Sequence, residues 1–162
     1  MADLLMRMPM TYEPKKTNRF ILTFQNELGI NSWYVESAKR PNIKIDTKEI
    51  KFLNTQTHVA GFFNWETIDV TFRDPIGPSA AQAVMEWVRL HAESVTGRMG
   101  YAAGYKKDVI LEMLDPTGVA VEKWILQNCS ITAADFGDVK YDTADISTVK
   151  ITLQPDRCIL VY

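Results

Sequence analysis

The stretch ETIDVTFRDPIG, residues 66–77, decides the fold class of this chain. Side chains alternate along an extended strand, so Ile68, Val70 and Phe72 share one side of it. The other side carries the polar residues Thr67, Asp69, Thr71 and Arg73. This alternation predicts a strand with one buried face, and the turn sequence Asp74-Pro75-Ile76-Gly77 ends it.

The same alternation recurs on both sides of this stretch. Residues 19–25 place Phe20, Leu22 and Phe24 on one side, and residues 144–154 alternate in the same way. Further strands are predicted over residues 32–38, 42–47, 107–114, 119–126 and 129–134. Asp115-Pro116-Thr117-Gly118 has Pro and Gly at positions that favour a β-turn between two of them. Residues 48–63 are mixed in character, and we interpret them as a long hairpin tip or loop.

One helix is predicted among the strands, over residues 79–96. Ser79 with Gln82 three residues later forms a capping box, which favours a helix start. Apolar residues then recur at helical spacing, and Gly97 is a plausible stop. The chain is therefore predicted to be mainly β (β+α), an antiparallel β-sandwich or barrel with one flanking α-helix.

Three parts are predicted along the chain. Residues 1–18 are interpreted as an extended arm, whose flexible apolar side chains Met6, Met8 and Met10 suit a partner surface. Residues 19–155 form the domain. Residues 156–162 form an apolar tail, in which Ile159 and Leu160 need cover from the core or from a neighbour.

Composition excludes several classes of protein. Hydrophobic residues make up 46% of the 162 residues and charged residues 23%, as in a soluble globular protein. The net charge of −2 comes without a basic stripe, so we expect no sequence-specific DNA binding. No apolar run reaches the roughly 18 residues of a membrane helix, and we expect neither a secretory signal nor a stable membrane association.

Catalytic and metal-binding motifs are not found in the sequence. His58 has no Cys or carboxylate at ligand spacing beside it, and His91 is interpreted as a core or boundary histidine of the helix. Cys129 and Cys158 are interpreted as structural thiols. The spacing of the four acidic residues between Asp135 and Asp145 does not match a calcium loop. We therefore expect a protein that is not an enzyme, with no catalytic residue, cofactor or metal.

Four segments carry a resemblance to a known family. They are Ser37-Ala38 with Pro41; Val59-Ala60-Gly61 followed by Phe63, Trp65 and the strand ending Phe72-Arg73-Asp74; the helix with its central Glu86-Trp87; and Tyr105-Lys106-Lys107 with the turn Asp115 to Gly118. In order and spacing, residues 17–155 resemble the tail tube proteins of T-even-type contractile bacteriophages. The arm and the tail do not match this pattern closely.

The resemblance implies a structural virion protein. Six subunits would close into a ring, and rings would stack into a hollow tube that conducts DNA and is wrapped by a contractile sheath. The implied partners are further copies of the chain, the sheath, baseplate and tail terminator proteins, and, transiently in the lumen, the tape measure protein and genomic DNA. The implied location is the virion tail, assembled in the bacterial host cytoplasm.

Two sets of residues are candidates for contacts within such a tube. Segment 48–63 has many apolar residues for a loop, which favours an interface between rings at Ile50, Phe52, Leu53, Phe62 and Phe63, together with the methionines of the arm and Ile159 and Leu160 of the tail. The polar faces of two strands could line a lumen without binding a polyanion tightly, at Thr67, Asp69, Thr71, Thr148, Lys150 and Thr152.

Several alternatives remain open at this stage. A baseplate tube-initiator, or the tube of a type VI secretion system or tailocin, would have the same fold. A small β-barrel that binds an apolar ligand, or an enzyme that uses Cys129, would belong to a different class.

Overall fold

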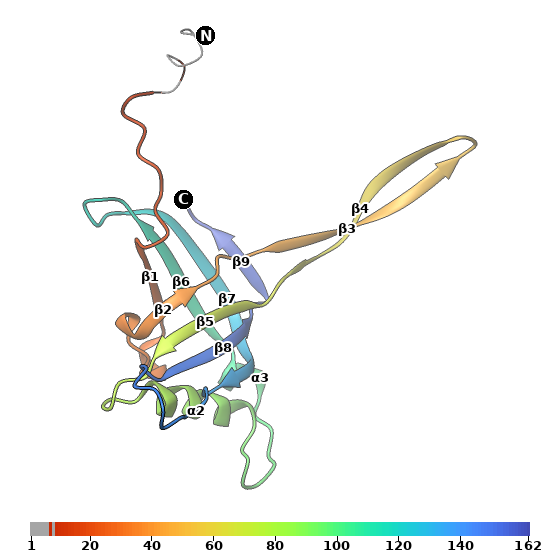
Figure 1. Cartoon of the computed structure of the whole chain (residues 1–162). Helices are drawn as coiled ribbons and strands as arrows, with labels where there is room; N and C mark the ends of the chain where they lie inside the picture. The colour runs from red at the N-terminus through yellow and green to blue at the C-terminus, as the bar shows by residue number, and fades with distance from the viewer. Residues whose placement is uncertain (1–6, 8) are drawn as a thin grey trace.

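The body of the molecule is one curved antiparallel sheet folded over a core (Figure 1). The computed structural model describes residue 7 and residues 9–162. Six strands form the sheet in the order β1 (Phe20–Phe24), β6 (Lys107–Leu114), β7 (Ala120–Asp135), β8 (Thr148–Gln154), β5 (Ile68–Arg73) and β2 (Val35–Ala38). A seventh strand, β9 (Arg157–Leu160), pairs with β7. The prediction of a mainly antiparallel β fold is confirmed.

The longest strand, β7, joins the two halves of the sheet. Its first part lies between β6 and β9, and its last part pairs with β8. Asn128 stands between the two parts with φ 53°, in the left-handed region that asparagine tolerates better than most residues. Its backbone N–H donates to Asp108 Oδ1 at 2.9 Å. Strands β8 and β9 both pair with β7 and are separated only by Pro155-Asp156. This break lies beside Asn128, because the N–H of Asp156 donates to the carbonyl oxygen of Gln127. The two neighbouring strands are therefore irregular at the same place.

The core fills the space between the sheet halves and the helix α2 (Ala80–His91). Trp87 is fully buried, and its indole Nε1 donates to the carbonyl oxygen of Tyr105 at 2.8 Å. Phe24 packs between Phe72 and Trp87, with ring centroids 5.6 and 6.2 Å away. The interior is therefore packed with side chains.

Helix α2 begins where predicted and ends earlier. Ser79 Oγ accepts from the N–H of Gln82 at 3.4 Å, as a helix cap does. The predicted end at residue 96 is wrong, since Ala92 is extended and pairs with Met99 across a short turn. Gly97, with φ 69°, belongs to that turn and does not cap the helix.

Other boundaries also differ from expectation. Residues 32–34 form a 3₁₀ turn, η2 (Ser32–Tyr34), ahead of β2. A second 3₁₀ turn, η1 (Asn26–Leu28), and a short helix, α3 (Ala102–Tyr105), also flank the sheet. The segment predicted as 129–134 is the end of β7, and β8 begins at Thr148, four residues after its predicted start at Ala144. The apolar tail predicted at residues 156–162 is a strand for most of its length, because β9 completes hydrogen bonds on β7.

Two appendages leave this body (Figure 1). One is the N-terminal segment ahead of β1. The other is a two-stranded hairpin of β3 (Ile43–Phe52) and β4 (Thr55–Trp65), which forms a sheet of its own. Residues 48–63 are thus strand on both sides of a two-residue tip. Of the two interpretations, hairpin tip or loop, the structure supports the hairpin.

Candidate assembly surfaces

The β3–β4 hairpin exposes apolar side chains along its whole length. Ladder pairs run from Ile43 opposite Trp65 at the base to Phe52 opposite Thr55 at the tip. Phe62 is 81% exposed and Leu53, at the tip, 88% exposed. Apolar surface of this extent on a monomer is typical of a surface that binds a partner.

A bulge divides the hairpin into a basal and a distal part. The register shifts between Ile45 and Thr47, and a Cβ added to Gly61 would lie 3.3 Å from the carbonyl oxygen of Asp46. The small residue therefore allows close approach of the two strands here. By strand alternation, Ile43 and Ile45 lie on one side of β3, and the distal Ile50 and Phe52 lie on the other.

The structure brings the five predicted hairpin residues onto one appendage, and all five are exposed: Ile50, Phe52, Leu53, Phe62 and Phe63. Met10 of the arm is also fully exposed. Met6 and Met8 lie outside the described residues. The assignment of these side chains to contacts between rings stays a prediction.

Ile159 and Leu160 lie elsewhere, on β9. This strand pairs with β7 on one side, and the described strands leave its other side open. Strands β1 and β2 likewise end the main sheet and pair on one side each. Open edges offer backbone donors and acceptors that a further strand can complete.

A polar face covers the side of β5 and β8 that points away from the core. Asp69 lies opposite Thr152, and Thr71 lies opposite Lys150. Thr152 Oγ1 donates to Asp69 Oδ1 at 2.9 Å, and Lys150 Nζ lies 3.9 Å from Asp69 Oδ2. Five of the six predicted lumen residues therefore meet on one face, the fifth being Thr148. Thr67 directly precedes β5.

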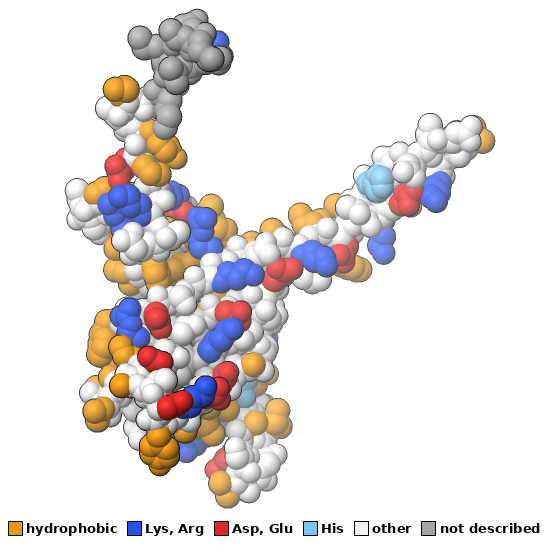
Figure 2. All heavy atoms as spheres, viewed as in Figure 1, with side chains coloured by type: hydrophobic (Ala, Val, Ile, Leu, Met, Phe, Trp, Pro, Cys, Tyr) orange, Lys and Arg blue, Asp and Glu red, His pale blue; other side chains and the backbone are white. Residues whose placement is uncertain are grey.

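Charges on this face are mixed. Arg73 pairs with Thr148, and Asp135 at the end of β7 pairs with Lys150. Alternation in the sequence predicted that Arg73 lies on this face. It did not predict the place of Asp135, because a bulge in β7 shifts the register between Ile131 and Ala133. Figure 2 shows acidic and basic side chains interleaved over β5 and β8. Such a face has no excess of cations that would hold a polyanion.

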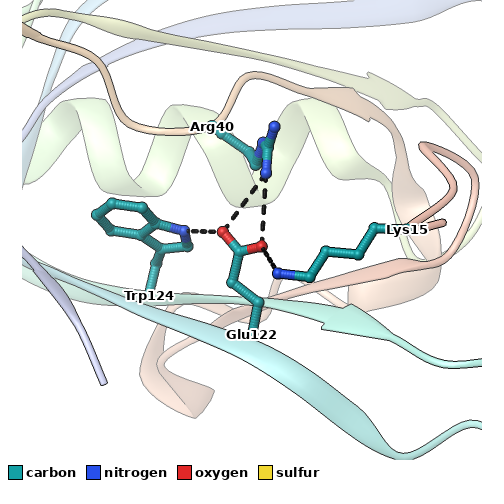
Figure 3. Close-up of polar contacts among 4 residues, drawn as sticks. All are labelled: Lys15, Arg40, Glu122 and Trp124. Carbon is teal, nitrogen blue, oxygen red and sulfur yellow. Dashed lines mark hydrogen bonds and ion pairs between the residues drawn. The ribbon is translucent and has the colours of Figure 1, made fainter. Parts of the chain in front are cut away.

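A buried carboxylate ties both appendages to the sheet (Figure 3). Glu122 on β7 is only 6% exposed. It accepts from Lys15 Nζ at 2.7 Å, from Trp124 Nε1 at 2.6 Å and from Arg40 Nη1 at 3.4 and 3.5 Å. Lys15 belongs to the arm, and Arg40 belongs to the connector between β2 and β3. One side chain thus fixes the base of the arm and the approach to the hairpin.

These contacts set the charge state of Glu122. The hydrogen bond from Lys15 lowers its pKa most, and Trp124 and the charges of Lys15 and Arg40 add to this, against the opposing effect of desolvation. Sequence reasoning missed this cluster, because Lys15 and Arg40 lie 107 and 82 residues from Glu122.

The candidate catalytic side chains, Cys129 and His91, pack against other parts of the fold. Cys129 is fully buried, and burial raises the pKa of its thiol far above the usual value and that of Cys158 to about 11. His91 Nε2 accepts from the backbone N–H of Ile131 at 3.3 Å, and the ring stacks on Tyr105 with centroids 4.2 Å apart. Burial lowers the pKa of His91. A neutral buried thiol is a poor nucleophile.

Two further findings concern the described part of the chain. None of its helices is long and apolar enough to cross a membrane. Residue 7 and residues 9–162 contain no grouping of three or more His, Cys, Asp or Glu side chains that could hold a metal ion.

Comparison with known proteins gives similarity in structure only. No family model matches the sequence, and no curated protein matches it. A structure of the anti-feeding prophage cap, described as a tube terminating cap, superposes with a TM-score of 0.74 at 22% identity, over 99% of this chain and 98% of that one. A sheet of similar form occurs in the sheath/tube terminator structure of an extracellular contractile injection system named PVC, with a TM-score of 0.76, 18% identity and coverage of 94% and 99%.

Two other structures extend the comparison. The sheath–tube complex of the same PVC system gives a TM-score of 0.73 at 19% identity, over 93% of each chain. Hcp1 from Flavobacterium johnsoniae is more distant, with a TM-score of 0.50 at 9% identity, over 88% of this chain and 94% of that one. At these identities the likeness shows the fold, and the fold is that of tube-type proteins of contractile injection systems.

Proposed function

We propose that this chain is a tube-type structural subunit of a contractile apparatus, assembling with further copies of itself into rings that stack into a hollow tube. The observation that carries the proposal is the β3–β4 hairpin, an ordered appendage with exposed Phe52, Leu53 and Phe62 on a body of tube-type fold. The apolar side chains of this hairpin contribute nothing to the core of their own chain, and exposed apolar surface of this kind is typical of a surface that another molecule covers.

The edges of the sheet support ring formation. Strands β1, β2 and β9 each have one side open among the described strands. A repeated head-to-tail contact closes into a ring when the rotation between neighbours is suitable. We propose six subunits per ring, with open edges completed by neighbouring copies.

The polar face of β5 and β8 is the proposed lumen wall. Its hydroxyls and balanced charges, with Asp69 beside Lys150, would let a polyanion pass without strong binding. In a bacteriophage tail the passenger would be genomic DNA, and the tape measure protein would occupy the same channel earlier. The proposed location is then the virion tail, after assembly in the host cytoplasm, and the proposed external partners are the sheath and baseplate proteins.

A second candidate is a protein that ends or begins such a tube. Two of the similar structures are those of a tube terminating cap and of a sheath/tube terminator. A terminator or a baseplate tube-initiator would be present as a single ring, whereas a tube subunit recurs along the whole length. An injection particle, a type VI secretion tube or a tailocin would use the same subunit without packaged DNA.

The ligand-binding and enzyme alternatives have less support. The space where a barrel would hold an apolar ligand is filled by Trp87, Tyr34 and Phe72, all fully buried. The Cys129 thiol is buried in the same core. We therefore propose a protein that is not an enzyme.

The test is electron microscopy of the purified full-length chain by negative staining over a range of concentrations, together with sedimentation velocity. Rings or tubes are expected. A strictly monomeric protein at all concentrations would contradict the proposal. Quantitative mass spectrometry of the native particle then separates tube from terminator, by many copies against one ring, and its nucleic-acid content separates a phage tail from the other particles.

A further inference from the structure

A groove lies beside α2. The β3–β4 hairpin points away from this helix (Figure 1). The lining of the groove includes Leu28 from η1, Ala81, Met85 and Glu86 from α2, and Phe136. The groove has a volume of about 690 Å³. That is within the range, about 300–1,000 Å³, of sites that enclose groups larger than a single side chain.

The loop that follows Phe136 gives this region its charge. Residues 135–145 contain four aspartates and one lysine, a net charge of −3. None of the ion pairs among the described residues includes Asp138, Asp142 or Asp145. The same loop exposes Val139 and Tyr141 to solvent. The region thus combines a partly apolar groove, whose lining also includes the ion pair of Glu86 and Arg89, with carboxylates that take part in no ion pair among the described residues.

The hairpin has the complementary composition. Strand β3 contains three lysines and two carboxylates, a net charge of +1. Glu49 pairs with Lys51 at 3.8 Å, while Lys44 and Lys48 take part in none of the ion pairs among the described residues. By strand alternation, both lysines share a side of β3 with Ile50 and Phe52. Asp46 lies on this side too, so the side that carries Ile50 and Phe52 has a net charge of +1.

The two surfaces belong to different ends of the molecule. A strand of ten residues extends about 33 Å at about 3.3 Å per residue, and the hairpin points away from α2 (Figure 1). A hairpin therefore cannot reach the groove of its own chain. It can reach the groove of a second copy placed beyond its tip, and that contact repeats without limit.

We propose that the groove between α2 and Phe136 receives the hairpin tip of a second copy of this chain, with Phe52 and Leu53 in the groove and Lys44 and Lys48 facing the carboxylates of residues 135–145. The inference rests on the proposed function, because it assigns the receiving surface for the contact between stacked rings. The occupant is a second copy of this chain, and the complementary charges orient its hairpin in the groove.

Charge reversal tests the pairing. The variant K44E/K48E and the variant D138K/D142K should each raise the concentration needed for assembly at least tenfold, because each places like charges across the contact. The four-fold variant K44E/K48E/D138K/D142K has the net charge of the wild type, and should assemble within about threefold of the wild-type concentration. All four side chains are exposed, so unfolding of the monomers should be unchanged.

A matched cysteine pair tests the place of contact. Leu53→Cys with Met85→Cys should form covalent oligomers between chains when the assembly is oxidised with copper phenanthroline. Leu53→Cys with Val121→Cys is the control, since Val121 is exposed on β7 and lies outside the groove. This control pair should stay uncrosslinked.

The outcomes separate the two proposals. A wild-type chain that never assembles contradicts the proposed function itself. A wild-type chain that assembles, with no recovery in the four-fold variant or with crosslinking through position 121 in place of 85, overturns the groove assignment and leaves the tube proposal standing.

Discussion

The body and the β3–β4 hairpin contain apolar residues in similar proportion, but the body buries them and the hairpin exposes them. In the body, Val70, Phe72 and Ile151 alternate with polar residues, and the sheet hides them completely. In the hairpin, Ile50, Phe52 and Phe63 stay in solvent on a sheet of only two strands. Two strands alone cannot bury a face. The difference separates residues that hold the subunit together from residues available to hold subunits to one another.

The largest expected effect comes from the body. Replacing Trp87 by Ala removes the largest side chain of the core and its hydrogen bond to the Tyr105 carbonyl. We expect a loss of about 3–5 kcal/mol in the free energy of unfolding. Urea denaturation followed by circular dichroism measures it. Phe52→Ala is the matched control in the hairpin and should change the same quantity by less than about 0.5 kcal/mol. Equal losses would erase the distinction between the two regions.

The next effect concerns the connection between the two regions. Glu122→Gln keeps the shape of the side chain and removes the charge that Lys15 and Arg40 bind. Hydrogen bonds to charged groups contribute about 1.5–3 kcal/mol, so we expect a loss at the lower end, since both cations are half exposed and can return to water. Hydrogen exchange should rise at residues 9–18 and 39–42 while the core of the sheet stays protected. An equal rise in hydrogen exchange over the whole chain would contradict a local role for Glu122 in holding the arm and the hairpin connector.

The same carboxylate predicts a pH dependence. Its pKa is lowered in the folded state from the ordinary 4.5, so its contribution is complete above pH 4.5 and is lost as the pH falls through the lowered value. The stability difference between the wild type and Glu122→Gln should therefore shrink as the pH falls below 4.5, and stay constant from there up to neutral pH. A difference that grows on acidification would have the wrong sign for this cluster.

A third effect belongs to the hairpin. Phe52→Asp places a charge on a side chain that is already in solvent, so unfolding of the monomer should be unchanged. The concentration required for assembly should rise at least tenfold, because burial of the new charge in an interface is unfavourable. Light scattering against concentration measures it. Ile76→Asp, at another fully exposed apolar position, is the control and should assemble as the wild type does.

The smallest effect concerns the bulge. Gly61→Ala adds a Cβ 3.3 Å from the Asp46 carbonyl oxygen, so the strands must part slightly. Hairpin amides should exchange several times faster, with a change of less than about 0.5 kcal/mol in global unfolding. Gly104→Ala, where the added Cβ meets no atom within 4 Å, is the comparison and should leave the hairpin as it is. A global loss would mean that the hairpin supports the body.

Sequence reasoning was most successful where one residue pattern met one physical requirement. Alternation at Ile68, Val70 and Phe72 predicted a half-buried strand, and Ser79 predicted the start of the helix, because each signal is local. The end of the helix was missed, since the turn at residues 92–99 depends on pairing between Ala92 and Met99. The face shared by β5 and β8 was predicted from two separate alternations.

The hairpin and the Glu122 cluster were harder to predict for different reasons. In β3 the apolar residues move from odd positions, Ile43 and Ile45, to even positions, Ile50 and Phe52, across the bulge, so no single period covers the segment. The cluster depends on contacts between residues more than eighty positions apart. Its members look like ordinary surface charges until the chain is folded.

The exposure of the hairpin has a consequence for how such subunits can diverge. From Lys44 to Asn64 no side chain of β3–β4 belongs to the buried core. The sizes of these side chains are therefore not limited by close packing, as those of Trp87 and Phe72 are. The sequence of this segment can be exchanged for that of a related subunit with little effect on folding. Assembly specificity would move with it only in part, because the proposed receiving groove beside α2 lies outside these roughly twenty residues and would have to change with them.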